Sequence, residues 1–346
     1  MTVQGVAKHY MMLQKYVVFI GIDVSRDWVD VSTKTVEELS YLGQFSNTEE
    51  GISSLLAFLK GKYGSKTKQW IVCFENTGQY SQVLCQILEQ FNIDYCMEHP
   101  LTIERSMGFR RGKTDKDCSQ RIARYVYKHL EDIRLSQLPK NEINELKLLI
   151  SRRRLLVKQK GALKVSMAER ARAFKGSTVY LLLKAENEKL VHFIKQQIKS
   201  LDKMIVQLIK QNREMSKNYF LLLSIKGIGP VIAAYLLMTT KNFTCFSNAR
   251  KLACYCGIAP FSKSSGKHQG KARVSKISNR QLNSLLGQGA MSAMKHDNQI
   301  RIYYERKLKE GKEKGCIVNA IKNKLLARAF AVIKRQSPYV PLANYI

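Results

Sequence analysis

The stretch YVVFIGIDVSRDWVDVS, residues 16–32, decides the fold of the first part of the chain. Its apolar run, VVFIGI at residues 17–22, is typical of a strand that is covered on both faces. Asp23 follows this run directly, and WVDV at residues 28–31 continues a β-rich pattern, which predicts Asp23 near the turn between two strands. Its carboxylate has two interpretations: it caps the turn, or it binds a hard divalent cation together with carboxylates from other elements.

The balance of charged residues indicates a polyanionic partner. The chain has 346 residues, 45% of them hydrophobic, which is enough for two or three domains with apolar cores. Its 58 Lys and Arg residues outnumber 27 Asp and Glu residues, and the formal net charge is +31. Such an excess favours nucleic-acid binding. No apolar stretch approaches the ~20 residues of a membrane span, and residues 1–15 lack the apolar core of a signal peptide. We therefore expect no membrane partner and a cytoplasmic, nucleoid-associated protein. Residues 1–15 are expected to form a leader.

Residues 16–135 alternate strand and helix patterns, which predicts an α/β sheet domain. Besides the first stretch, we expect strands at 41–46, 70–75 and 93–98 and helices at 51–64 and 81–91. The strand WIVCFE ends in Glu75, much as the first strand leads into Asp23. If these two strands are parallel neighbours, their carboxylates lie at the same edge of the sheet.

A third acidic residue follows in RRGKTDKDCSQRIARYVYKHL, residues 110–130. A basic loop leads into a helix with apolar residues at helical spacing, and Asp115 lies in its first turn. A carboxylate there also interacts favourably with the helix dipole, which is the alternative to metal binding. Asp23, Glu75 and Asp115 together form the set that a two-metal phosphoryl-transfer site requires, because paired Mg²⁺ ions stabilise both the attacking and the leaving oxygen of a phosphodiester.

Residues 136–220 carry helical patterns without a strand signal. Two apolar stripes at spacings of three and four predict a helical hairpin or coiled coil that is broken at FKGST, residues 174–178. The charged faces of these helices are either solvated or in contact with nucleic acid.

Residues 221–346 form the expected C-terminal domain, which is mostly helical. In LLLSIKGIGPVIAAYLL, residues 221–237, Gly227 and Gly229 lie between two apolar helices, as in helix-hairpin-helix modules whose glycine amides approach a phosphate. A plain helix–helix turn is the alternative. Residues 262–280 are rich in Gly, Ser, Lys and Arg and are predicted as a loop between helices, and residues 303–335 read as two closing helices.

The motifs FIGIDVSRDWVDV, CFENTG and RGKTDKDCSQRIARYVY resemble those of the DEDD transposases of the insertion sequence 110 family. The N-terminal domain of that family is similar to the RuvC resolvase (RNase H-like) fold. Its helix motif reads Lys-Thr-Asp-x-x-Asp, and the second Asp is the fourth metal ligand. The resemblance therefore implies that Asp23, Glu75 and Asp115 are ligands, and the fourth position falls on Cys118. Asp117 is adjacent, but position i+2 on a helix points away from Asp115, whereas i+3 shares its face.

The C-terminal segment resembles the second domain of the family, whose pattern runs Gly-Leu-x-Pro, Ser-Gly and Ser-Lys. The matching residues are Gly257-Ile258-Ala259-Pro260, Ser265-Gly266 and Ser275-Lys276. The match implies that Ser265 is the nucleophilic serine, with Ser264 and Ser262 as the neighbouring alternatives. A serine needs activation at neutral pH, and the metal at the acidic triplet is the candidate because no Ser-His-Asp arrangement occurs; His268 is an alternative base.

Basic residues and two glycines make up the predicted nucleic-acid contacts, since they neutralise or approach phosphates. They are Arg110, Arg111, Lys113, Lys263, Lys267, Lys271, Arg273, Lys276, Gly227 and Gly229.

The resemblance implies a prokaryotic DNA transposase or recombinase that cuts and rejoins strands through a phosphoserine intermediate. It also implies Mg²⁺ as the cofactor, with Mn²⁺ as an ion that tolerates a soft ligand better, and a bridge RNA that pairs with donor and target double-stranded DNA. Family members assemble as dimers and tetramers. Two other functions stay open: a RuvC-like nuclease that uses water instead of Ser265, and an inactive nucleic-acid-binding descendant in which Cys118 marks lost chemistry.

Overall fold

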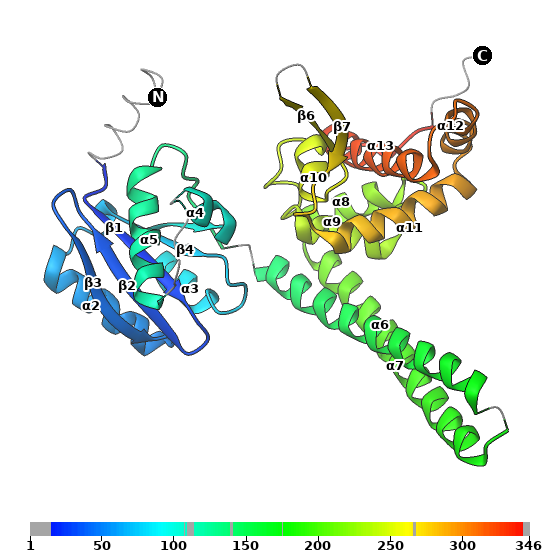
Figure 1. Ribbon diagram of the computed structural model, residues 1–346, viewed down its shortest axis with the longest axis horizontal. Helices are drawn as coiled ribbons and strands as arrows, with labels where there is room; N and C mark the ends of the chain where they lie inside the picture. Colours follow the sequence, from blue (N-terminus) through cyan, green and yellow to red (C-terminus); the bar gives the residue numbers. More distant parts are fainter. Residues whose placement is uncertain are drawn as a thin grey trace. The chain divides into compact units, whose positions relative to one another are not determined.

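The computed structural model describes residues 15–106, 108, 114–138, 141–174, 176–265 and 268–341. The chain forms two compact units, residues 1–138 and 139–346. The first contains a mixed sheet with helices, and the second is mostly helical (Figure 1). Within the described ranges, no helix has both the length and the apolar character that a membrane crossing requires.

The first unit is built on a five-stranded sheet with the strand order β3-β2-β1-β4-β5. Strands β1 and β2, and β2 and β3, are antiparallel, whereas β4 runs parallel to β1 and β5 runs parallel to β4. The strands are β1 (Val18–Val24), β2 (Trp28–Lys34), β3 (Leu39–Ser46), β4 (Trp70–Glu75) and β5 (Asp94–Glu98). All five strands predicted from the sequence are present, and β1 and β4 are the parallel neighbours that the prediction required.

Helices cover both faces of this sheet, which explains why β1 is apolar on both sides. The helices are α2 (Glu49–Tyr63), α3 (Gln82–Gln90), α4 (Pro100–Ser106) and α5 (Asp115–Lys128), and a short 3-10 turn, Thr67–Gln69, precedes β4. Ile20 packs in a core cluster with α2 and α3, whereas Phe19, Cys73 and Cys96 pack with Ile122 of α5. Figure 1 shows α5 over one face of the sheet and α2 and α3 behind it.

The second unit begins with the predicted helical hairpin. Helices α6 (Asn141–Ala173) and α7 (Thr178–Gln211) run side by side in opposite directions (Figure 1). The break falls inside the predicted 174–178 segment, where Gly176 adopts φ +97° and the side chain of Ser177 accepts a hydrogen bond from the backbone of Tyr180. Ile150 of α6 and Ile205 of α7 join the core of the helices that follow, so this hairpin belongs to the second unit.

The remaining helices of the second unit pack around one apolar core. They are α8 (Arg213–Leu223), α9 (Pro230–Thr239), α10 (Ala249–Tyr255), α11 (Arg280–His296), α12 (Asn298–Lys309) and α13 (Lys314–Arg335). The two closing helices predicted for residues 303–335 correspond to α12 and α13. The mixed sheet of the first unit and the helical second unit fit the RNase H-like transposase architecture that the resemblance implies.

One prediction of this region was wrong. Residues 262–280 are not a loop throughout, because β6 (Pro260–Ser265) and β7 (His268–Val274) form an antiparallel hairpin. The hairpin has no apolar alternation to reveal it, since Phe261 and Val274 at its base are about half exposed, at 47% and 48%. Strands that cover no core leave no periodic signal in the sequence.

Candidate active site

Four carboxylates line up across four neighbouring strands, close to the edge where β1, β4 and β5 end. Asp23 is paired with Asp30 of β2, and Glu75 is paired with Glu98 of β5. Asp23 and Glu75 each lie one position beyond the last pair of the β1–β4 ladder, so the parallel register brings them side by side. Paired residues of neighbouring strands project to the same face, and here it is the face that α5 covers.

Helix α5 lies directly on β1 because residue 21 has no side chain. A Cβ at Gly21 would lie 2.3 Å from the carbonyl oxygen of Ser119, a distance that real Cβ atoms do not show. Beside this contact, the hydroxyl groups of Ser119 and Ser32 form a buried hydrogen bond of 2.8 Å between the helix and β2. These two contacts fix the N-terminal part of α5, which carries Asp115 and Cys118.

Negative charge is concentrated around Asp23. Burial, together with the charges of Glu75 and Asp115, raises the pKa of Asp23 to about 6, while a hydrogen bond with Cys118 opposes this rise. A carboxyl group that is perturbed by burial and by specific charged neighbours is typical of a functional site. The structure therefore brings together Asp23, Glu75, Asp115 and Cys118, the four positions predicted from the sequence.

The donor types at this edge, carboxylate oxygens, are those that a hard divalent cation prefers. Among the residues that the structure describes, no group of three or more His, Cys, Asp or Glu side chains is placed so that it could hold a metal ion. Mg²⁺ is commonly held by one or two carboxylates and retains several waters, so an open set of carboxylates suits it. Asp23, Glu75 and Asp115 are the residues that would hold the ion, and a cation there would relieve the repulsion that raises the pKa of Asp23.

Asp117 is engaged elsewhere. The hydroxyl of Thr114 donates to its carboxylate at 2.6 Å, and the backbone nitrogen of Asp117 donates to the same hydroxyl at 3.2 Å. This reciprocal pair caps the N-terminus of α5, and Asp117 is exposed. Both acidic residues of the first turn favour the helix dipole, but only Asp115 also acts on Asp23.

A small cavity of about 60 Å³ opens next to these residues. It is lined by Glu75, Cys118, Glu104, Arg121, Pro100 and Ile103. Glu104 and Arg121 were not predicted as site residues. Glu104 lies on α4, a helix of only seven residues, which is too short to show a helical period in the sequence.

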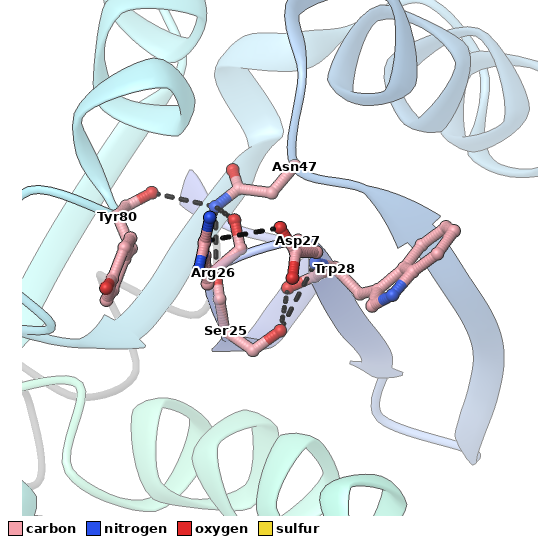
Figure 2. A network of polar contacts seen from close by, with 6 residues as sticks. All are labelled: Ser25, Arg26, Asp27, Trp28, Asn47 and Tyr80. Atoms are coloured by element: carbon pink, nitrogen blue, oxygen red, sulfur yellow. Dashed lines mark hydrogen bonds and ion pairs between the residues drawn. The ribbon is translucent and has the colours of Figure 1, made fainter.

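Asn47, which lies between β3 and α2, ties together the two segments that follow Asp23 and Glu75. Its side-chain amide donates to the backbone carbonyl oxygens of Ser25 and Tyr80, both at 2.9 Å. Figure 2 shows this amide between the turn after β1 and the loop after β4. The sequence offered no signal for this role, because a single Asn before a helix usually reads as a cap.

The two outer carboxylates of the row, also missed by sequence reasoning, have partners of their own. Asp30 is buried and accepts hydrogen bonds from the hydroxyl of Tyr41 at 2.6 Å and from the amide of Gln44 at 3.2 Å. The bond to Asp30 raises the pKa of Tyr41 to about 12. Burial raises the pKa of Glu98, and Arg134 opposes the rise. Side chains alternate between the two faces of the sheet along WVDVS, so the sequence together with the β1–β2 register could have placed Asp30 on the same face as Asp23.

Ser265 lies in the second unit, whereas the acidic residues lie in the first. It is the last residue of β6 and pairs with His268, the first residue of β7. Ser264 pairs with Gln269, and Ser262 is exposed. The predicted nucleophile is thus located at the end of the hairpin where β6 leads into β7.

The predicted basic contacts are distributed along and beyond this hairpin. Lys263 belongs to β6, Lys271 and the exposed Arg273 belong to β7, and the exposed Lys276 follows the hairpin. Four predicted contacts lie outside the described residues: Arg110, Arg111, Lys113 and Lys267.

Gly227 and Gly229 form the predicted turn between two helices, but they differ in their surroundings. Gly227 has φ +98°, and a Cβ there would lie 2.6 Å from the carbonyl oxygen of Gly289 in α11. Helix packing therefore accounts for Gly227. Gly229 is exposed at the N-terminus of α9, and a Cβ there would meet no atom within 4 Å.

Comparison with known proteins agrees with this arrangement. A transposase family model, for the DEDD transposases of IS110, matches residues 20–171. A second model, described as the transposase IS116/IS110/IS902 family, matches residues 219–305.

Relatives align over both parts of the chain. The pilin gene-inverting protein of Moraxella bovis is 28% identical over 330 residues, which cover 93% of this chain and 97% of the relative. A putative transposase of Sinorhizobium fredii is 24% identical and covers 89% of this chain and 90% of its own. The 43.6 kDa protein of insertion element IS110 of Streptomyces coelicolor is 33% identical over 113 residues, or 33% of this chain and 28% of its own. The chain belongs to the IS116/IS110/IS902 family of transposases and is a DNA transposase or recombinase.

Proposed function

We propose that this enzyme cleaves and rejoins DNA at specific sites through a phosphoserine intermediate. The oxygen of Ser265 forms a bond to the phosphorus of the scissile phosphodiester, and the bond to one deoxyribose oxygen breaks; that oxygen leaves with a proton. A second DNA hydroxyl then attacks the phosphoserine and releases the serine, so the number of phosphodiester bonds is conserved and no ATP is needed. The resemblance of Ser265-Gly266 and its flanking motifs to the family pattern supports this role.

Asp23, Glu75 and Asp115 are proposed to hold Mg²⁺ or Mn²⁺ for this chemistry. DEDD transposases generally use divalent metal ions. An ion bound there would supply Lewis-acid stabilisation of the charge on the phosphate. The single observation that carries the proposal is that Asp23 of β1 lies close to Glu75 of β4 and Asp115 of α5. Besides burial, the charges of these two neighbours raise the pKa of Asp23. The chain's own contribution is to gather this charge at a partly buried edge of the sheet.

A bridge RNA encoded by the element is proposed to select the DNA sites by base pairing. The net charge of +31 supports a complex that holds RNA and two DNA duplexes at once, in a dimer or tetramer. The relative from Moraxella bovis is named for inverting a pilin gene and aligns with nearly the whole chain. Inversion of a DNA segment is therefore one of the outcomes that we propose for this enzyme, beside transposition.

A plasmid assay tests the proposal. The plasmid carries the gene with its natural flanking DNA, and new DNA junctions are amplified and sequenced. We expect junctions with the wild-type chain and with the matched control Ser262→Ala, and none with Ser265→Ala or Glu75→Gln. Junctions that persist in Ser265→Ala but are lost in Glu75→Gln would overturn the role of Ser265 as the nucleophile, and cleaved DNA without new junctions from the wild-type chain would favour a nuclease that uses water. Binding without cleavage by the wild-type chain would favour the inactive descendant.

A further inference from the structure

The β6–β7 hairpin carries the predicted nucleophile but covers no apolar core of its own. Phe261 and Val274 at its base are about half exposed, and the two strands pack mainly on each other. Ser265 lies at the opposite end, where β6 leads into β7. A two-stranded hairpin is marginally stable by itself, so its direction depends on the segment to which it is attached. The residues that hold this segment therefore determine where Ser265 lies.

Residues 256–259 connect α10 to β6, and all four are buried. Backbone polar groups in a buried segment need hydrogen-bond partners. The N–H groups of Cys256, Gly257 and Ile258 donate to carbonyl oxygens of residues 252–254 in α10, at 2.9–3.0 Å. The carbonyl oxygens of the same three residues point away from this helix end and need donors from elsewhere.

Two asparagine side chains supply these donors. Asn283 of α11 donates from its amide to the carbonyl oxygens of Cys256 at 2.9 Å and Gly257 at 3.3 Å. The amide of Asn319 of α13 donates to the carbonyl oxygen of Ile258 at 2.6 Å. Three consecutive carbonyl groups before the hairpin are thus held by side chains from two different helices.

Lys322 of α13 fixes the orientation of the Asn283 amide. Its ammonium group donates to Asn283 Oδ1 at 2.7 Å. Because an ammonium only donates and a backbone carbonyl only accepts, the amide oxygen has to face Lys322 and the amide nitrogen has to face the backbone. Lys322 is half-buried, and burial lowers its pKa. A desolvated charge costs stability, so packing alone does not account for a lysine at this position.

The strand that leaves the hairpin is attached to the same segment. Gly257 has φ +65°, and a Cβ there would lie 2.6 Å from the Cβ of Ser278, which follows β7. The backbone nitrogen of Asn279 donates to the carbonyl oxygen of Tyr255 at 2.9 Å. Both ends of the hairpin are therefore fixed to the segment that the two asparagine side chains hold.

We propose that Asn283, Asn319 and Lys322 are positioning residues of the strand-transfer reaction. They hold the segment before β6, and the hairpin that extends from it presents Ser265 to the scissile phosphate. The inference rests on the proposed role of Ser265 as the nucleophile. Misplacement of a reacting group by about 1 Å lowers a rate by up to ~100-fold, so the attachment of the hairpin bears directly on the rate.

A competing interpretation is that these side chains only stabilise the second unit. Asn218 provides a matched control, because it is 3% exposed and its side-chain amide also joins separate segments of that unit. It donates to Asn242 Oδ1 at 2.9 Å and accepts a hydrogen bond from Gln336 at 3.1 Å. Asn283→Ala and Asn218→Ala each remove the hydrogen bonds of one asparagine, but only the first releases the segment before β6.

The reaction is measured with the full-length protein, a plasmid that carries the natural flanking DNA, and RNA transcribed from that DNA. Single-turnover rates of junction formation are compared with plasmid affinity and with Tm. We expect Asn283→Ala and Lys322→Met to lower the rate about 10–100-fold with little change in plasmid affinity. Lys322→Arg should keep most of the rate, because a guanidinium also donates to the amide oxygen. Asn218→Ala should lower Tm as much as Asn283→Ala but keep the wild-type rate.

Hydrogen exchange of the same variants without DNA or RNA reports the attachment of the hairpin directly. We expect faster exchange in residues 256–259 and in both strands of the hairpin for Asn283→Ala and Lys322→Met. Asn218→Ala should show the wild-type exchange in these segments.

Two results would overturn the positioning role and leave Ser265 as the nucleophile. One is an equal loss of rate in Asn283→Ala and Asn218→Ala, which would make the loss a matter of stability. The other is a wild-type rate in both Asn283→Ala and Lys322→Met, even with faster exchange in the hairpin. Normal junction formation by Ser265→Ala would instead overturn the proposed function itself, because the hairpin would then carry no nucleophile.

Discussion

Asp23 and Glu75 lie side by side at the ends of two parallel strands, each one position beyond the last pair of the β1–β4 ladder. Burial and the carboxylates around Asp23 raise its pKa, and the hydrogen bond with Cys118 opposes this rise. Such an arrangement lowers the stability of the folded chain at neutral pH, as is typical of functional sites.

The first prediction concerns the effect of Asp23 on the free energy of unfolding. The pKa of Asp23 rises from 3.8 to about 6 on folding, so the proton is bound more tightly in the folded state. Below pH 3.8 Asp23 is protonated in both the folded and the unfolded chain, so it does not lower the free energy of unfolding. Its destabilising effect grows as the pH rises from 3.8 to about 6 and is complete above about 6. We expect Asp23→Asn to raise the free energy of unfolding at pH 7 by about 1–2 kcal/mol, a figure reduced for partial exposure.

Chemical denaturation of the metal-free protein at pH 4 and pH 7 measures this effect. The two proteins should be nearly equal at the lower pH, and added Mg²⁺ should stabilise the wild type only. A variant that is less stable than the wild type at pH 7 would support the alternative in which Asp23 caps a turn.

A second prediction follows from the contact between β1 and α5. Gly21→Ala should lower the free energy of unfolding by about 2–4 kcal/mol and abolish recombination, because the new Cβ collides with the helix backbone that positions Asp115. Gly61→Ala is the matched control, since a Cβ at Gly61 of α2 meets no atom within 4 Å. We expect that control to gain about 0.5–1 kcal/mol. Equal thermal stability of Gly21→Ala and wild type would contradict the close packing of α5.

The third prediction concerns Asn47. Asn47→Ala leaves the carbonyl oxygens of Ser25 and Tyr80 without their shared donor and, because both bonds are exposed, should cost about 0.5–1.5 kcal/mol of stability. Hydrogen exchange should rise in the segments that follow β1 and β4, the two ends at which Asp23 and Glu75 lie. Faster exchange confined to α2 would instead indicate that Asn47 only stabilises the start of that helix.

The fourth prediction compares the two neighbours on α5. Cys118→Asp should increase Mg²⁺-dependent recombination, since a hard ligand replaces a soft one, and should reduce any advantage of Mn²⁺. Asp117→Asn should leave recombination nearly unchanged and cost about 0.5–1 kcal/mol of stability through the helix cap. The reverse pattern, with activity lost in Asp117→Asn and unchanged in Cys118→Asp, would make Asp117 the fourth carboxylate.

The strands and the central pair of carboxylates were predictable because buried strands leave apolar runs that end abruptly. The runs before Asp23 and Glu75 are of this kind, and parallel pairing then places both residues at one edge. Glu104 was not predictable, since α4 is held by the single buried residue Ile103 and shows no period. The β6–β7 hairpin was missed because an exposed two-stranded ribbon needs no apolar face.

Contacts between distant segments were also beyond the sequence. The hydrogen bond between Ser32 and Ser119, and the carbonyl oxygens that Asn47 brings together, join segments that are distant along the chain. Polar residues that connect separate segments leave no local pattern, so only the three-dimensional arrangement shows their role.

The most direct test of the central claim is to find the covalent bond between enzyme and DNA. Purified wild-type protein is incubated with Mg²⁺, its RNA and a DNA site that is nicked so that religation fails, and the adduct is digested and mapped by mass spectrometry. We predict a nucleotide attached to the oxygen of Ser265, absent from Ser265→Ala and still present in Ser262→Ala. An adduct on another residue, or cleaved DNA with no adduct at all, would contradict the account.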